Sequence, residues 1–149
     1  MANERTLVLC KPDALQRGLI GDIVARFERK GLKIAGMKML RVDETLAARH
    51  YAEHVKKAFY PHLQAFITSS PVIAMAIEGD NAVEVVRSLM GTTNPQTAAP
   101  GTIRGDFGIN LTKNLVHGSD SPASAERELA LFFEEGELYH YDRSVEAWL

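Results

Sequence analysis

Short apolar runs alternate with helical patterns along this chain, and this alternation limits the folds that it can adopt. Residues 5–10 and 72–77 have the length and apolar content of buried strands. Residues 32–42 mix apolar and basic positions and most resemble a further strand, and Leu115 with Val116 predicts a short fourth one. The chain is therefore expected to build a small sheet from four short strands.

The segments between these strands carry helical periodicity. Apolar residues from Ile20 to Phe27 recur at i, i+3, i+4 and i+7, and Gly31 marks the expected end of that helix. Asp13 and Asp80 look like helix caps. The other helical patterns cover residues 43–70, where Pro61 can open a new helix, a stretch from Asp80 to Gly91, and a stretch from Ser121-Pro122 to near Gly136.

The predicted order is β-α-β-α-β-α-loop-β-α. This order is compatible with an α/β (α+β) fold of the ferredoxin-like type, a split βαβ arrangement whose four-stranded antiparallel sheet is covered by helices. We see no internal repeat, low-complexity tract or linker. The 149 residues are hard to divide in two, so residues 1–149 are predicted to form a single domain.

Charge and cysteine content exclude several classes of function. The 17 lysine and arginine residues against 19 aspartate and glutamate residues give a formal net charge of −2, without the basic excess of a general nucleic-acid binder. Cys10 is the single cysteine, which excludes an internal disulfide and any multi-cysteine zinc site. No secretory pattern opens the sequence, and the longest apolar stretch is far short of a membrane span. A cytoplasmic location is therefore expected.

Residues 91–113 are rich in Gly, Thr, Pro and Asn, and loops of this length are usually functional. The common phosphate-binding fingerprints, G-x-x-x-x-G-K-[ST] and G-x-G-x-x-G, are absent from the sequence. His50 and His54 are four residues apart on an expected helix, but no H-E-x-x-H pattern or third ligand accompanies them. We interpret the two histidines as a solvated helix face, and no metal site is predicted.

The segment 114–120 places a histidine, His117, at the end of a buried strand, followed by a glycine that permits close approach of another group. The helix expected from Ser121 has free N–H groups and a positive dipole end that would favour an anion beside this histidine. A neutral imidazole is a competent nucleophile when an acceptor holds its second nitrogen. The alternative is a buried histidine that is hydrogen-bonded to backbone, and the spacing leaves both interpretations open.

Several cations and donors could converge on a polyphosphate beside His117. Lys11 follows the first strand, Arg87 lies on the polar side of a helix, and Arg104 lies between two glycines of the long loop. Each also has a purely structural explanation. Lys11 could be a surface lysine, Arg87 could pair with Glu84, and Arg104 could staple its own loop.

Four segments together closely resemble those of nucleoside diphosphate kinases. They are Lys11-Pro-Asp-Ala-Leu-Gln-Arg-Gly18, Gly91-Thr-Thr-Asn-Pro95, Pro100-Gly-Thr-Ile-Arg-Gly-Asp-Phe107 and Asn114-Leu-Val-His-Gly-Ser-Asp120. The resemblance implies a ferredoxin-like catalytic domain over residues 1–149. It implies ping-pong transfer of a γ-phosphoryl group from a nucleoside triphosphate, typically ATP, to a diphosphate, through a phosphohistidine and with broad base specificity. It also implies Mg²⁺ carried on the nucleotide phosphates and a homo-oligomer built from dimers, as a tetramer or a hexamer.

The same resemblance assigns roles to individual residues. His117 would be the phosphorylated nucleophile, with Ser119 and Glu128 fixing its orientation and Tyr51 supporting its pocket. The residues expected to bind the nucleotide are Lys11, Arg87, Arg104 and Thr93 at the phosphates, Asn114 at the sugar and phosphates, and Phe59 against the base.

Two rival interpretations remain at this level. A non-catalytic nucleotide-binding module would keep the fold without turnover, although it would be free to lose some of the residues that this chain retains. A ferredoxin-like nucleic-acid binder predicts a basic surface and paired aromatics on the sheet, which the composition does not favour.

Overall fold

The computed structural model describes residues 3–149, which build a four-stranded antiparallel sheet with the strand order β2-β3-β1-β4. The strands are β1 (Asn3–Cys10), β2 (Lys33–Leu40), β3 (Val72–Asp80) and β4 (Val116–Gly118). All three pairings are antiparallel, and β1 lies between β3 and β4. The predicted ferredoxin-like α/β fold is confirmed.

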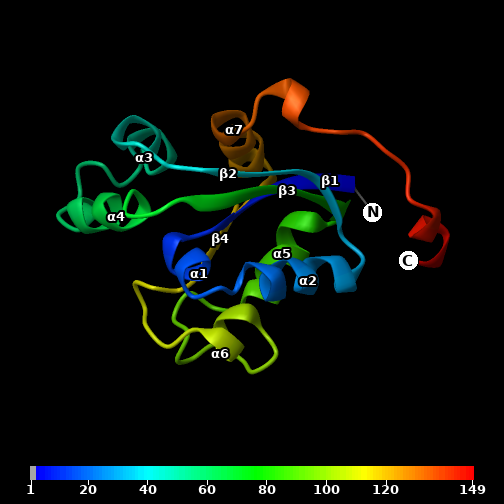
Figure 1. Cartoon of the computed structure of the whole chain (residues 1–149), viewed down its shortest axis with the longest axis horizontal. Helices are drawn as coiled ribbons and strands as arrows, with labels where there is room; N and C mark the ends of the chain where they lie inside the picture. The colour runs from blue at the N-terminus through cyan, green and yellow to red at the C-terminus, as the bar shows by residue number, and fades with distance from the viewer. Residues whose placement is uncertain (1–2) are drawn as a thin grey trace.

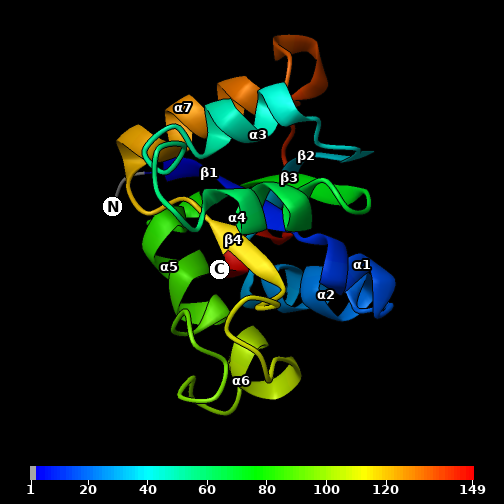
Figure 2. The ribbon, with the colours of Figure 1, turned by 90° about the vertical axis from the view of Figure 1, so that its left-hand side faces the viewer.

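Helices occupy the connections between these strands. They are α1 (Pro12–Gln16), α2 (Ile20–Lys30), α3 (Glu44–His50), α4 (Tyr60–Ile67), α5 (Ala82–Met90), α6 (Ile103–Phe107) and α7 (Pro122–Phe132), followed by the 3₁₀ turns η1 (Glu135–Glu137) and η2 (Ser144–Trp148). Helices α1, α2 and α5 cover one face of the sheet, and α3 and α7 cover the other (Figures 1 and 2). Within residues 3–149, none of the helices has both the length and the apolar character that a membrane crossing requires.

The core is divided by the sheet into two apolar clusters. Alternate residues of β1 point to opposite faces, so that Val8 and Cys10 pack with α2 and α5, while Leu7 and Leu9 pack with α3 and α7. Because the second half of β1 is buried on both faces, residues 7–10 form an apolar run without polar alternation.

Two predicted helix caps are wrong. Asp13 lies inside the first turn of α1, where Lys11 is the N-cap, and its carboxylate instead accepts a hydrogen bond from the Leu115 N–H at 3.1 Å. Asp80 is the last residue of β3, paired with Asn3, and Asn81 is the N-cap of α5. The sheet pairing extends three residues beyond the apolar run 72–77 and so displaces the start of the helix.

The segments after β3 also differ from the prediction in detail. The long loop 91–113 contains the short helix α6, whose N-cap Thr102 accepts a hydrogen bond from the Gly105 N–H at 3.0 Å. Helix α7 ends at Phe132 because Phe133 is extended, and η1 follows it. After η1 the chain returns along β2, where the Tyr139 N–H donates to the Ala35 carbonyl at 2.8 Å.

Candidate active site

A cavity of about 380 Å³ opens beside β4, between the end of α3, α5, α7 and the long loop. It collects residues that are far apart in the sequence: Lys11, Tyr51, Arg87, Thr93, Arg104, Asn114, His117 and Glu128. Of the residues that the sequence assigned to the site, Ser119 and Phe59 are not part of the wall of this cavity.

His117 occupies the middle of the short strand β4, opposite Leu9 of β1. Its Nε2 atom lies 2.8 Å from Oε1 of Glu128 on α7, and the buried Ser119 hydroxyl donates to the same oxygen at 2.7 Å. A carboxylate accepts hydrogen bonds, so Nε2 carries the ring proton and Nδ1 keeps a lone pair. The arrangement leaves Nδ1 as the nitrogen that is free to act as a nucleophile.

The electrostatics of Glu128 support this arrangement. Burial raises the pKa of Glu128, but the hydrogen bond from His117, the charge that His117 carries when it is protonated, and the hydrogen bond from Ser119 outweigh burial and hold the pKa below its usual value. Glu128 therefore stays ionised at neutral pH and keeps accepting the proton on Nε2. Ser119 acts on His117 through Glu128.

The chain enters β4 through an uncommon backbone conformation. Leu115 is fully buried and has a φ of 75°, the left-handed region that non-glycine residues rarely adopt. Two hydrogen bonds hold it there, one from its N–H to Asp13 and one from the Lys11 N–H to its carbonyl at 2.8 Å. The corner between β1 and α1 thus fixes the segment that leads into His117.

Three of the polar residues in the cavity form a connected group. Lys11 Nζ donates to Asn114 Oδ1 at 2.9 Å, and Asn114 Nδ2 donates to the Thr93 carbonyl at 3.1 Å. Burial, together with the nearby charge of Arg104, lowers the pKa of Lys11 to about 8. Lys11 is therefore a half-buried cation close to its titration point, which an arriving anion would stabilise.

Arg104 fastens its own loop, which was the structural alternative to phosphate binding, and it also lines the cavity. Its guanidinium donates to the carbonyls of Asn114 at 3.2 Å, Gly91 at 3.0 Å and Val116 at 2.7 Å. This residue fastens both ends of the long loop to β4. A guanidinium has five N–H groups, so the three hydrogen bonds leave capacity for a phosphate oxygen.

Two aromatic residues lie around the mouth of the cavity. Tyr51 lines it, and burial raises the pKa of its hydroxyl to about 12, which keeps the group protonated as a hydrogen-bond donor. Phe59 is 48% exposed and packs against His54, whose ring centroid lies 5.5 Å away and which itself lines the cavity. An exposed ring at this edge suits the predicted stacking against a base.

The interpretation of His50 as a solvated residue is wrong. His50 is 5% exposed, and its ring centroid lies 4.7 Å from that of His117 with an interplanar angle of 85°. Burial lowers the pKa of His50 to about 3, so it is neutral near pH 7. The signal was present in the sequence, because Leu46 and Ala47, four and three residues earlier, put His50 on the apolar face of α3.

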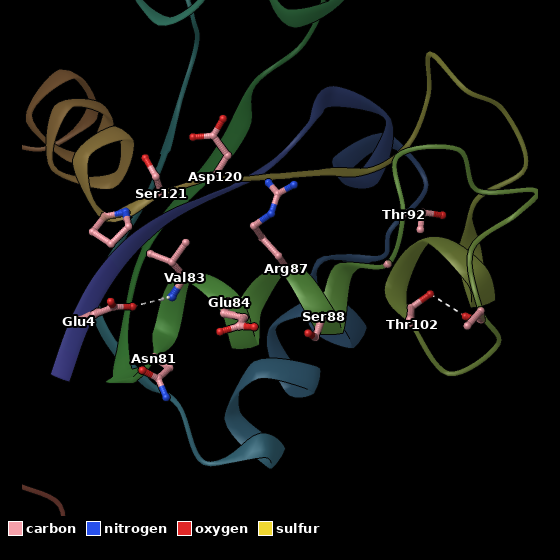
Figure 3. A pocket seen from close by; sticks show the side chains of 13 residues that line it. Glu4, Asn81, Val83, Glu84, Arg87, Ser88, Thr92, Thr102, Asp120 and Ser121 are labelled. Carbon is pink, nitrogen blue, oxygen red and sulfur yellow. Dashed lines mark hydrogen bonds between the residues drawn. The ribbon is translucent and has the colours of Figure 1, made fainter. Parts of the chain in front are cut away.

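A larger cavity lies on the other side of Arg87 and Asp120, which it shares with the cavity around His117. Figure 3 shows Arg87 reaching from α5 toward the side where Asp120 and Ser121 precede α7. Glu4 and Glu84 also line this cavity, and Glu4 accepts a hydrogen bond from the Val83 N–H at 3.2 Å. Both cavities contain carboxylates, but Lys11, Arg104 and Arg127 line the smaller one alone, so the smaller cavity is the better candidate for a polyphosphate.

Removal of Ser119 or Glu128 tests how His117 is oriented. We expect Ser119→Ala to lower kcat by about tenfold, because Glu128 keeps its bond to His117, and Glu128→Ala to lower it by about 100-fold or more. Steady-state rates together with nucleotide affinity measure the effect, and KM should change little in both variants. An equal loss in the two variants would contradict the order of contacts Ser119–Glu128–His117.

The fold and this cavity define the chain as a ferredoxin-like α/β protein in which a histidine faces cations that are suited to phosphate groups. Comparison with known proteins agrees with this class. Residues 4–138 match the family model described as nucleoside diphosphate kinase. The chain belongs to the nucleoside diphosphate kinase family, whose members are phosphotransferases that bind nucleotides.

Relatives resemble the chain over nearly its whole length. Nucleoside diphosphate kinases of Archaeoglobus fulgidus and Natronomonas pharaonis are 56% and 58% identical to it, covering 98% of this chain and 97% and 96% of those proteins. A solved nucleoside diphosphate kinase of Halobacterium salinarum in complex with CDP is 57% identical with a TM-score of 0.96, over 99% of this chain and 98% of that one. A transition-state mimic of the Borrelia burgdorferi enzyme with vanadate and ADP is 42% identical with a TM-score of 0.90, over 98% of this chain and 96% of that one.

Proposed function

We propose that this nucleoside diphosphate kinase works by ping-pong transfer through Nδ1 of His117. The lone pair of Nδ1 attacks the γ-phosphorus of a nucleoside triphosphate, typically ATP, and the bond to the β,γ-bridging oxygen breaks. The nucleoside diphosphate leaves, and a second diphosphate then takes the phosphoryl group from the histidine. The observation that carries the proposal is the bond between Nε2 and Glu128 at 2.8 Å, which leaves Nδ1 unprotonated.

The remaining residues bind and position the phosphates in this proposal. Lys11, Arg87 and Arg104 supply the positive charge that phosphoryl transfer needs, and Thr93 and Asn114 supply neutral donors. Phe59 offers a ring face that every base can stack against, which accounts for a broad base specificity.

The donor set of the cavity fits Mg²⁺ that is carried by the nucleotide. Glu128 is occupied by His117 and Ser119, while Lys11 and Arg104 present cations to the phosphate oxygens. Mg²⁺ bound to these oxygens would neutralise charge on the transferring group. The protein residues orient the phosphates, and none of their contacts requires a metal ion held by the protein.

The test is direct labelling of the enzyme. Incubation with γ-labelled ATP should produce an acid-labile, alkali-stable protein phosphate that transfers to added GDP. If the protein binds nucleotide but never becomes labelled, it is the non-catalytic binding module, and the proposal is refuted.

The pH dependence of kcat/KM should report Lys11. Burial lowers the pKa of Lys11 from 10.5 to about 8, so the free enzyme loses this charge as the pH rises through about 8. We expect kcat/KM to fall above that pH, and kcat to fall less, because bound phosphate raises the pKa of the lysine. Lys11→Arg should lower kcat/KM, but its kcat/KM should no longer fall at alkaline pH. An unchanged fall in that variant would assign the titration to another group.

The domain organisation, cellular location and oligomeric state of the enzyme are also proposals. We infer a single catalytic domain over residues 1–149, a cytoplasmic location, and a homo-oligomer built from dimers as a tetramer or hexamer. One sheet joins both core clusters, which supports the single domain, and the edge strand β2 exposes Met37 and Met39 at 46% and 60%, which supports association between chains.

A further inference from the structure

We propose that His50, His117 and Glu128 form a binding site for a borderline-soft divalent cation such as Zn²⁺, and that occupation of this site blocks the nucleophile. One ring nitrogen of each histidine and one carboxylate oxygen of Glu128 lie within 4.8 Å of one another. Two histidines and one glutamate are a ligand set that zinc takes in proteins, with the fourth position left to water or substrate.

His50 supplies a second, independent observation. Its side chain is 5% exposed and lines the cavity, yet among residues 3–149 neither of its ring nitrogens has a hydrogen-bond partner. A buried polar group without a partner costs free energy, and a bound ion is one of the few features that account for it. His50 has no part in the phosphoryl transfer proposed above, so that reaction does not explain its burial in this place.

The ring geometry is close to that of a metal site. Two imidazoles bound to one tetrahedral zinc ion have ring centroids about 5 Å apart, and the centroids of His50 and His117 are 4.7 Å apart. Ligand atoms around zinc lie about 3.3 Å from one another, so the three groups need to close by no more than about 1.5 Å. The contact between Nε2 of His117 and Glu128, at 2.8 Å, is already within this range.

Binding at Nε2 changes the tautomer of His117. The metal takes the Nε2 lone pair, so Nε2 gives up its proton to solvent, and Nδ1 takes up one proton from solvent to keep the ring neutral. Nδ1 then has no lone pair to attack phosphorus. This inhibitory consequence depends on the proposed role of Nδ1, whereas the binding itself does not.

Positive charge around the cavity limits the affinity of the proposed site for Zn²⁺. Arg127 Nη2 lies 3.7 Å from Glu128 Oε2, and Lys11 lines the same cavity. Both side chains repel a dication. Mg²⁺ prefers oxygen ligands and regular octahedral geometry, so it is expected not to compete for two imidazoles and one carboxylate.

Zinc titration of the whole enzyme without nucleotide, in competition with a chromophoric chelator, tests the site. We expect one Zn²⁺ per chain, an affinity about 100-fold weaker in His50→Ala and in His50→Gln, and an unchanged affinity in His54→Ala and His62→Ala. His62 is an exposed histidine of α4, and His54 is not one of the three proposed ligands, so both are matched controls. Circular dichroism confirms that each variant is folded.

A gain of affinity provides an independent check. Arg127→Gln removes a cation whose side chain is 46% exposed, so we expect Zn²⁺ to bind only several-fold more tightly. Full binding in both His50 variants, or loss of binding in His62→Ala, would overturn the site. If Zn²⁺ binds at His50, His117 and Glu128 but wild-type enzyme is never labelled by γ-labelled ATP, the metal site stands and the proposed mechanism is refuted. Labelling that zinc does not reduce would refute the inhibitory consequence alone.

Discussion

His117→Ala is expected to lose phosphoryl transfer by at least about 10⁴-fold while nucleoside diphosphate affinity stays within about threefold. In the proposed mechanism the imidazole contacts only the group that is transferred, whereas Lys11, Arg87 and Arg104, which line the same cavity, bind the phosphates that remain. Labelling with γ-labelled ATP and calorimetric binding of ADP measure the two effects separately. Full labelling of the variant would place the phosphoryl group on another residue.

The matched control is His62→Ala. His62 is exposed on α4, away from the cavity, so its removal should change neither labelling nor affinity. A parallel loss in both variants would indicate that histidine replacement perturbs the fold. The comparison therefore separates chemistry at Nδ1 from a general loss of structure.

Arg104→Ala should weaken turnover, nucleotide binding and stability together. The side chain is 7% exposed and donates to three carbonyls, and each carbonyl that loses its buried donor costs about 1–3 kcal/mol. We expect a loss of roughly 3–5 kcal/mol in the free energy of unfolding, which lowers Tm by about 10 °C in a protein of this size. Denaturant titration and thermal unfolding measure it, alongside KM and kcat.

Arg26→Ala is the control for this prediction. Arg26 also fastens the long loop, through the Gly101 carbonyl at 2.9 Å and Asp106 at 2.7 Å, but its side chain is 27% exposed. Exposed ion pairs contribute less than about 1 kcal/mol, so this variant should stay near wild type. An Arg104→Ala enzyme that is no less stable than Arg26→Ala would show that the three carbonyl bonds contribute little.

Periodicity in the sequence was sufficient for the fold because the segments that pack against the sheet are strongly patterned. The apolar face from Ile20 to Phe27 and the end at Gly31 are both found in α2. The predictions of helix caps at Asp13 and Asp80 were wrong because tertiary contacts determine the roles of these residues. Asp13 bonds to Leu115, 102 residues away, and β3 continues to Asp80. Such long-range pairings leave no local signal.

Most of the predicted site residues line one cavity, but the contacts between them could not be predicted. Spacing selected His117 and the cations, and the resemblance to the family supplied Glu128 and Ser119. Spacing could not show that Arg104 is engaged by three carbonyls, that Ser119 reaches His117 only through Glu128, or that His50 is buried against His117. These facts depend on how the loop, α3 and α7 meet around β4.

The left-handed backbone at Leu115 has a consequence for the order in which the enzyme folds. This conformation costs about 1–2 kcal/mol and is held by the corner at Lys11 and Asp13, so it becomes the dominant conformation when segments about a hundred residues apart have met. Contacts of that sequence separation are slow to form, unlike the turns of a helix. Helix formation alone therefore does not position His117, and the proposed nucleophile depends on the pairing of β1 with β4.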